Sequence, residues 1–256
     1  MSVILTHEGP VSVITMDLPP MNLLNIEVID QLIQCHEEAD HHPETRVIIT
    51  RSAVTEMFSN GLNPMYVLKR DEAGRADVFR AIGRLLNRLF KLGKPHIAAL
   101  NGPAMAGGAV LALTADFRYM EQEHGRLCFS EPKVGLPIPE PISAIIASFC
   151  TPSMVREVVL YGKNMDAQTA LASGLVDAVA PGEEGLQELI EQGVGRLARL
   201  SPAVLRATKI GMRRRLYKLT ETFENDLGDF AQFTHADFLG EGLQALVEQR
   251  HPVFKR

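Results

Sequence analysis

Residues His96–Glu140 carry the most informative stretch of the sequence, which reads HIAALNGPAMAGGAVLALTADFRYMEQEHGRLCFSEPKVGLPIPE. The stretch begins with the apolar run His96–Leu100, which is too short for a typical helix and lies between Pro95 and an Asn-Gly pair. This pattern predicts a buried strand. Small residues follow, and a short helix is expected over Val110–Ala115.

The turn between this strand and this helix contains two adjacent glycines, Gly107 and Gly108. The first N–H groups of a helix have no partner within the helix, and they can hold an anion. Glu131 follows about twenty residues along the chain, and Glu140 comes soon after it. Anion-binding donors followed by a carboxylate that can move a proton indicate a site that forms an enolate.

The composition is that of an ordinary globular protein. The 256 residues suit one large domain, or one domain with an appended helical lobe. A hydrophobic fraction of 46% and a charged fraction of 22% predict a sizeable core. The net charge is −5 and no arginine-rich run alternates with aromatics, which argues against a nucleic-acid partner.

Cysteine spacing and the residues near the two ends of the chain indicate the cellular compartment in which the protein is expected. Three cysteines lie far apart without a CxxC pair, which indicates free thiols in a reducing compartment. The first residues contain no basic segment leading into a long apolar run, so neither a signal peptide nor a membrane span is expected. The final tripeptide is not a peroxisomal signal. We expect a cytoplasmic protein without membrane association.

Hydrophobic periodicity predicts an α/β front followed by a helical back. The runs Val3–Thr6 and Val11–Met16 are expected to pair as a hairpin. Asn25 is expected to cap the first helix. The other expected strands are Val47–Thr50, Phe117–Met120, Leu127–Phe129 and Leu175–Val179, and the expected helices are Ile26–Asp40, Val78–Lys91, Ile142–Phe149, Pro152–Tyr161, Asp166–Ser173, Gly185–Leu200, Pro202–Arg214, Thr220–Phe238 and Gly242–Gln249.

The sequence gives little support for a dinucleotide site, a nucleophilic serine site, a phosphate-binding loop or a metal site. The GPAMAGGA turn lacks the GxGxxG spacing of a dinucleotide fold, and no GxSxG or GxxxxGK[ST] motif occurs. The histidines His36, His41 and His42 are interpreted as a solvated helix end rather than a metal site, and no metal is expected. We interpret Asp116 and Arg118 as structural.

Four motifs cover much of the chain, namely FSNGLN (Phe58–Asn63), ALNGPAMAGGAVLALTADFRY (Ala99–Tyr119), FSEPKVGL (Phe129–Leu136) and EGLQALVEQRHPVFK (Glu241–Lys255). Together these motifs resemble the crotonase (enoyl-CoA hydratase/isomerase) superfamily, and the last of them is similar to the last helix of that family. The resemblance implies a ββα spiral core over residues 1–195 and a C-terminal helical trimerisation region over 196–256, forming a homotrimer or hexamer.

The resemblance also implies an acyl-CoA thioester substrate, so coenzyme A is part of the substrate and no separate cofactor is expected. The thioester oxygen would accept hydrogen bonds from the backbone N–H groups of Leu62 and Gly107. The strip that matches the segment cradling the adenine end of CoA comprises Ser59, Asn60, Gly61, Leu62 and Asn63.

The departures from the hydratase pattern concern the acid–base residues. Hydratases of this family carry two glutamates that position a water. Here the first position is Val110, and the second falls on Glu131. One carboxylate is enough to move a proton from C2 to C4 of a 3-enoyl thioester. The single-glutamate pattern resembles the Δ3,Δ2-enoyl-CoA isomerases of fatty-acid β-oxidation.

Glu140 is a second candidate base. Some isomerases, of the peroxisomal type, carry their base within a residue of this position. An acid at a helix start fits Glu140 as well. The alignment favours Glu131.

Other functions stay open from sequence alone. They are an enoyl-CoA hydratase, a non-catalytic acyl-CoA-binding homologue, and a thioester hydrolase or decarboxylase.

Overall fold

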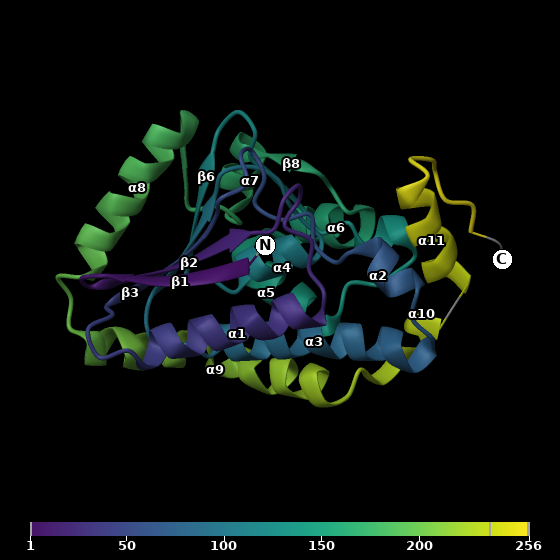
Figure 1. Ribbon diagram of the computed structural model, residues 1–256, viewed down its shortest axis with the longest axis horizontal. Helices are drawn as coiled ribbons and strands as arrows, with labels where there is room; N and C mark the ends of the chain where they lie inside the picture. Colours follow the sequence, from purple (N-terminus) through teal and green to yellow (C-terminus); the bar gives the residue numbers. More distant parts are fainter. Residues whose placement is uncertain (1, 236, 255–256) are drawn as a thin grey trace.

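A computed structural model describes residues 2–235 and 237–254. A six-stranded sheet with helices on both faces lies beside a three-stranded sheet, and the last helices extend to one end of the molecule (Figure 1). The strands are β1 (Ser2–Glu8), β2 (Val11–Asp17), β3 (Val47–Ser52), β4 (His96–Leu100), β5 (Ala104–Met105), β6 (Phe117–Glu121), β7 (Arg126–Cys128), β8 (Met165–Asp166) and β9 (Ala178–Ala180). The helices are α1 (Ile26–His41), α2 (Pro64–Leu68), α3 (Glu72–Phe90), α4 (Gly107–Leu113), α5 (Glu140–Phe149), α6 (Pro152–Tyr161), α7 (Ala167–Ser173), α8 (Gly182–Leu197), α9 (Pro202–Asn225), α10 (Ala231–His235) and α11 (Asp237–Val247), with 3-10 turns η1 (Glu131–Val134) and η2 (Gly228–Phe230).

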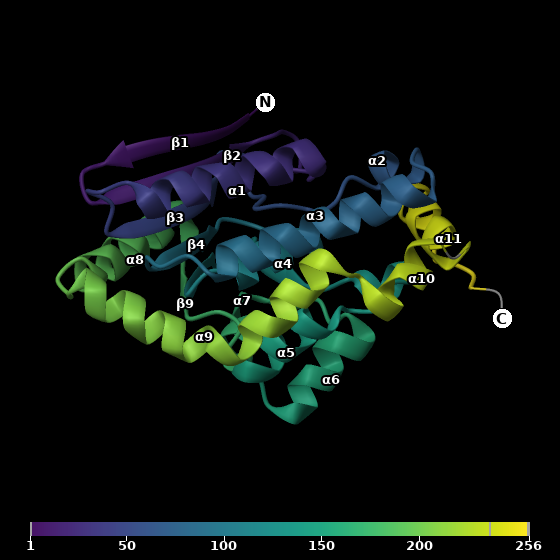
Figure 2. The same ribbon diagram turned by 90° about the horizontal axis from the view of Figure 1, so that it is seen from below.

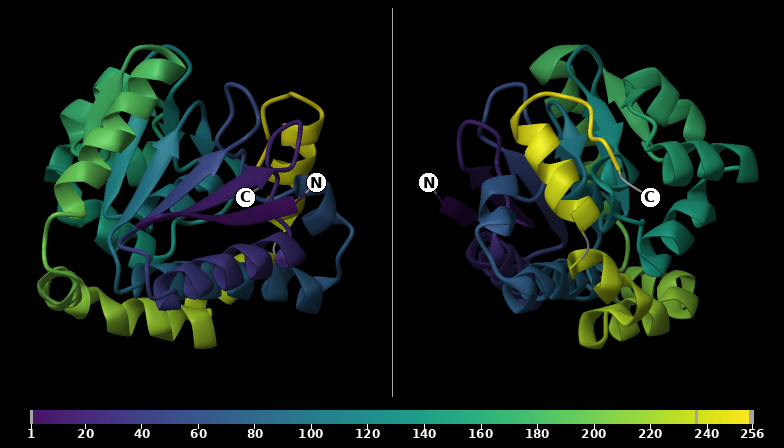
Figure 3. Two further views of the ribbon diagram at one scale, coloured as in Figure 1. Left: turned by 60° about the vertical axis from the view of Figure 1, so that its left-hand side comes forward. Right: turned by 90° about the vertical axis from the view of Figure 1, so that its right-hand side faces the viewer.

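The larger sheet has the strand order β1-β2-β3-β4-β6-β9. β1 and β2 form the expected antiparallel hairpin, and the strands that follow pair in parallel. Parallel strands need cover on both faces. Alternate side chains meet this need, because Ile48 packs with α1 and α3 whereas Ile49 packs with α8. Figure 3 shows α8 on the side of the sheet away from α11.

Helices α1 and α3 begin at capping residues that the sequence supplies. The Asn25 side chain accepts from Val28 N–H at 2.8 Å, as predicted. Asp71 caps α3 by accepting from Gly74 N–H at 2.9 Å. The predicted start of this helix, at Val78, was therefore six residues late. The short helix α2, which Asn63 caps, was not predicted.

The smaller sheet positions the glycine turn. Parallel pairing of β5 with β7 places Met105 opposite Cys128, and β8 pairs with β7 in antiparallel fashion. The next residue, Ala106, donates its N–H to Cys128 O at 2.8 Å. The turn that starts α4 is thereby held next to the segment that leads from β7 into Glu131.

Helix α9 lies along α3 on the underside of the molecule (Figure 2). Two of its cations are buried, Lys209 and Arg213, and both bind Asp116, at 2.6 Å and 2.8 Å respectively. The buried Arg118 binds Asp177 at 3.1 Å. Asp116 and Arg118 are thus both engaged in ion pairs within the fold, which agrees with their interpretation as structural residues.

The interpretation of His36 was wrong. Its side chain projects from α1 and is buried rather than solvated. The ring nitrogens contact Leu32 O of the same helix and Thr50 Oγ1 of β3, each at 2.6 Å. Burial lowers its pKa to about 4. His96 Nε2 shares the same hydroxyl at 2.8 Å. His41 lies at the exposed end of α1.

Two predicted C-terminal helices, Pro202–Arg214 and Thr220–Phe238, have different bounds in the structure. α9 continues to Asn225, because no glycine or proline interrupts the residues after Arg214. The chain then turns at Gly228, whose φ is +53°. The predicted strand Leu175–Val179 is also shifted, to β9.

The predicted division of the chain at residues 195 and 196 falls in the last turn of α8. The C-terminal helices do not form a separate core. Phe223 of α9 and Leu243 of α11 share one apolar cluster with Phe79 of α3. Trimerisation by these helices stays a prediction.

Candidate active site

Two loops that are distant in sequence meet beside the start of α4. Ser59 forms a bridge with Ala104, in which Ser59 N–H donates to Pro103 O at 3.0 Å and Met105 N–H donates to Ser59 O at 2.9 Å. Gly108 packs so closely on Ser59 that a Cβ there would collide with the Ser59 carbonyl. The FSNGLN loop is thus fixed against the Gly-Gly turn.

A second bridge sets the direction of the Leu62 N–H group. Leu24 N–H donates to Gly61 O, and Asn63 N–H donates to Leu24 O, both at 2.8 Å. In a parallel bridge these groups point toward Leu24, so the N–H of Leu62 points to the opposite side. That side is the start of α4.

The N–H groups of Leu62 and Gly107 are neighbours and have no hydrogen-bond partner among the described residues. A Cβ placed on Gly107 would lie 3.5 Å from the Leu62 nitrogen. A Cβ on Gly61, whose φ is +78°, would lie 2.8 Å from the Gly107 nitrogen and would obstruct the pair. Two free donors, one from the first turn of α4 and one from the neighbouring loop, can stabilise a developing oxyanion.

Ala106 has a strained backbone that the sequence does not signal. Its φ of 46° and ψ of −119° are unusual for a residue with a Cβ, and such conformations cost about 1–3 kcal/mol. The hydrogen bond from its N–H to Cys128 O holds it in place. This backbone precedes Gly107 directly, so it sets the direction of the Gly107 N–H group.

Glu131 is the first residue of η1 and lines a cavity of about 370 Å³. Leu62, Gly107 and Val110 line the same cavity. The Glu131 Oε2 atom is buried and has no hydrogen-bond partner among the described residues. Burial raises the pKa of this carboxyl to about 7, and a contact with its own backbone N–H lowers it only partly. An orphaned carboxyl of raised pKa in a cavity is suited to act as a proton carrier at neutral pH.

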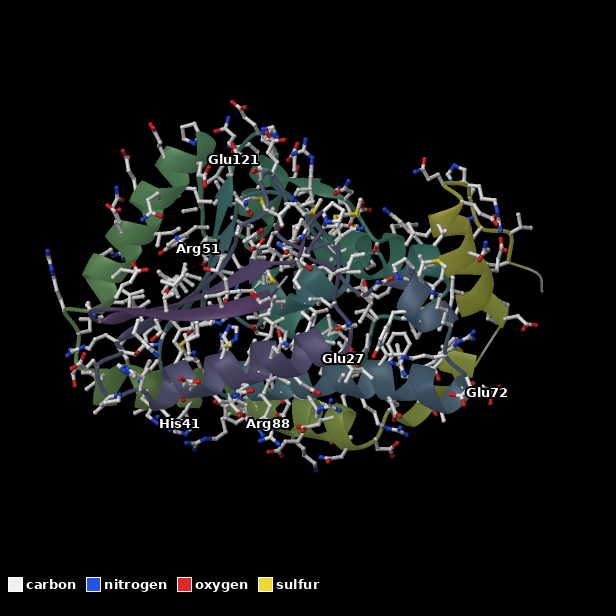
Figure 4. The ribbon with its side chains drawn as sticks, in the orientation of Figure 1. Glu27, His41, Arg51, Glu72, Arg88 and Glu121 are labelled. Atoms are coloured by element: carbon white, nitrogen blue, oxygen red, sulfur yellow. The ribbon has the colours of Figure 1, made fainter. Side chains whose placement is uncertain are left out.

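Glu121 shows how a structural carboxylate differs from Glu131. It lies at the end of β6, far from α11 (Figure 4). It accepts from the N–H groups of Glu123, His124 and Gly182, at 2.8, 2.6 and 3.2 Å. Although burial raises the pKa of Glu121, these hydrogen bonds hold it below its usual value.

Glu140, the other candidate base, lies outside this cavity. It is the exposed first residue of α5 and lines a neighbouring cavity instead. Pro139, which precedes Glu140, lines both cavities, as do Phe223 and Phe230. The structure therefore brings Glu131 together with Leu62 and Gly107, and it does not bring Glu140 to them.

Within the loop predicted to cradle CoA, two side chains already have structural partners. Ser59 is fully buried, and its hydroxyl donates to Asn22 O at 2.8 Å. Asn63 caps α2 by accepting from Met65 and Tyr66 N–H. Of the polar residues in this loop, Asn60 lines the cavity.

The C-terminal helix completes the cavity, which the sequence did not indicate. Leu239, Leu243 and Leu246 of α11 line it, and so do the residues around Arg250. Gly242 makes this docking possible, since a Cβ there would collide with the backbone of Val134, in the segment that carries Glu131. Figures 1 and 3 show α11, in yellow, at the end of the molecule opposite α8.

Within residues 2–235 and 237–254, no group of three or more histidine, cysteine or acidic side chains could hold a metal ion. No helix there combines the length and apolar character needed to cross a membrane.

The chain is similar in sequence to several known proteins. The sequence profile of the family described as Enoyl-CoA hydratase/isomerase matches residues 6–256. A Thermus thermophilus protein with the provisional name enoyl-CoA hydratase is 30% identical over 97% of this chain and 98% of its own length. A carnitinyl-CoA dehydratase of Salmonella heidelberg is 29% identical over 98% of this chain and 97% of its own.

Among solved structures, human mitochondrial Δ3,Δ2-enoyl-CoA isomerase has a TM-score of 0.90 at 25% identity. The match covers 97% of this chain and 98% of the human one. The profile match, the curated relatives and the shared α/β architecture lead to one conclusion. The chain belongs to the enoyl-CoA hydratase/isomerase family, within the crotonase superfamily.

Proposed function

We propose that this protein is a Δ3,Δ2-enoyl-CoA isomerase, which moves the double bond of a 3-enoyl-CoA to position 2. The observation that carries the proposal is the single orphaned carboxyl, Glu131, in a cavity that also contains Val110 and the free N–H pair. An apolar valine cannot act as a second ligand for a reacting water. The chemistry left to the site is a proton shuttle by one base.

In the proposed mechanism, the thioester oxygen accepts hydrogen bonds from Leu62 and Gly107 N–H. The Glu131 carboxylate removes a proton from C2, and the negative charge of the dienolate gathers on that oxygen. Glu131 then returns the proton to C4, which gives the conjugated 2-enoyl thioester and regenerates the carboxylate. The electron pairs shift along C2–C4, and no atom is gained or lost.

The oxyanion donors and the base are each expected to contribute substantially to the rate of isomerisation. Each oxyanion donor typically contributes about 10²–10³ in rate. A positioned base contributes about 10²–10⁴. The raised pKa of Glu131 also helps, because a base with a pKa near neutrality matches a weak carbon acid better than an ordinary carboxylate does.

The test is turnover of 3-hexenoyl-CoA by the purified protein, followed by the absorbance of the conjugated thioester. Water addition to crotonyl-CoA and release of free CoA are measured in parallel. We expect isomerisation to be faster than both side reactions. Hydration as the main reaction would favour a hydratase, which the name of the Thermus thermophilus relative suggests. Binding of acyl-CoA without any reaction would favour a non-catalytic homologue.

A further inference from the structure

A second cavity, of about 350 Å³, adjoins the first. The two cavities share three lining residues, Pro139, Phe223 and Phe230. Both phenylalanines are buried, and their rings meet edge to face with 5.6 Å between centroids. Phe230 also contacts Phe79 edge to face at 5.3 Å. A wall of aromatic side chains therefore separates the two cavities.

The lining of the first cavity contains both polar and apolar groups, which would orient an acyl-CoA within it. Lys133, Asn164 and Arg250 belong to this lining, and they suit the polar pantetheine and phosphate groups. The aromatic wall belongs to an apolar cluster that also contains Leu136 and Leu239. From the thioester position at Gly107, a hydrocarbon chain gains most by extending toward this cluster.

The second cavity carries charges of one sign. Glu140, Asp226 and Asp229 line it, and its lining contains no lysine, arginine or histidine among the described residues. The phosphates of CoA are repelled from such a rim. The second cavity is thus unsuited to the CoA head group, and the aromatic wall lies between it and the far end of an acyl chain in the first cavity.

We propose that Phe230 ends the acyl-chain pocket and sets the upper limit of chain length, and that removal of its ring joins the two cavities. The proposal rests on the acyl-CoA substrate of the proposed function, but not on the isomerase reaction. It gives Phe230 the role of a specificity-determining residue.

Phe230 is a better position for this test than Phe223. Phe223 lies on α9 where that helix contacts α3, and a Cβ on Gly83 would lie only 3.0 Å from its carbonyl oxygen. Phe230 ends the 3-10 turn η2 and belongs to neither α9 nor α3. Its replacement removes the ring contacts with Phe79 and Phe223 and leaves the backbone contact between α9 and α3 at Gly83 in place.

The experiment measures dissociation constants by calorimetry for saturated acyl-CoAs from butyryl to dodecanoyl. In the wild type, affinity should rise by about fourfold for each added methylene until the chain meets Phe230, and then stop rising. In Phe230→Ala, the rise should continue, with about 15-fold tighter binding for two further methylenes. The matched control is Phe233→Ala, because Phe233 lines the second cavity alone. This control should keep the wild-type profile.

Butyryl-CoA reports whether each variant retains its site, because this chain is too short to need the space behind the wall. If Phe230→Ala does not fold, Phe230→Leu should give a smaller extension in the same direction. An unchanged length profile in a variant that binds butyryl-CoA normally would overturn the proposal, as would an equal extension in Phe233→Ala. Saturated acyl-CoAs do not react, so these outcomes are independent of whether the protein is an isomerase.

Discussion

Replacement of Glu131 by glutamine should stabilise the free protein at neutral and alkaline pH and lose this effect in acid. Burial raises the pKa of Glu131 from 4.5 to about 7 in the folded state. Each pKa unit corresponds to about 1.4 kcal/mol. The charged carboxylate in the cavity therefore destabilises the folded protein by about 3 kcal/mol.

The pH window follows from proton binding. Between pH 4.5 and about 7, the folded protein retains the Glu131 proton that the unfolded chain has released. The folded state then binds more protons, so this contribution to stability falls as pH rises. The cost is absent below pH 4.5 and complete above about pH 7. Glutamine carries no charge at any pH, so the Glu131→Gln variant does not have this cost.

The assay is urea unfolding of wild type and Glu131→Gln at a series of pH values across this window. The difference in unfolding free energy should change by about 3 kcal/mol in favour of the variant from acid to alkaline pH. Any constant packing effect of glutamine cancels in this comparison. Glu140→Gln is the matched control, because its side chain is exposed. A difference for Glu131→Gln that does not vary with pH would refute the reasoning.

Three further predictions concern catalysis. The kcat/KM for isomerisation should rise about tenfold per pH unit below about pH 7 and level off above it, as Glu131 loses its proton; a flat pH profile would contradict this. Val110→Glu should introduce a second carboxylate into the cavity, so hydration of crotonyl-CoA should become measurable where wild type shows little; no gain would argue that Val110 does not determine the reaction. Gly61→Ala should reduce kcat by about 10²–10³, because the added Cβ would lie 2.8 Å from the Gly107 nitrogen and obstruct the oxyanion pair. A kcat within a factor of two of wild type would count against the proposed role of this pair.

The sequence predicted the local parts of this site better than their assembly. The strand ending at Leu100 and the α/β character of the front are confirmed, because apolar periodicity is a local signal. The turn at Gly107 was recognised from its glycines. The left-handed backbone of Ala106 had no such signal, since it depends on a hydrogen bond to a residue of another strand.

Long-range packing explains the remaining differences. The burial of His36 follows from its contact with Thr50 on β3, which the helical pattern of α1 does not contain. The tail was predicted to be helical, but its docking on the Glu131 segment depends on the close fit of Gly242 against Val134. The cytoplasmic location and the homotrimer or hexamer stay predictions, because neither is a property of a single folded chain.

The central claim is that Glu131 alone carries the proton between C2 and C4. The most direct measurement is the rate of conversion of 3-hexenoyl-CoA to 2-hexenoyl-CoA by wild type, Glu131→Gln and Glu140→Gln, each shown to bind hexanoyl-CoA. We predict that Glu131→Gln loses about 10²–10⁴ in kcat and that Glu140→Gln remains close to wild type. Full activity in Glu131→Gln together with loss of activity in Glu140→Gln would contradict the account.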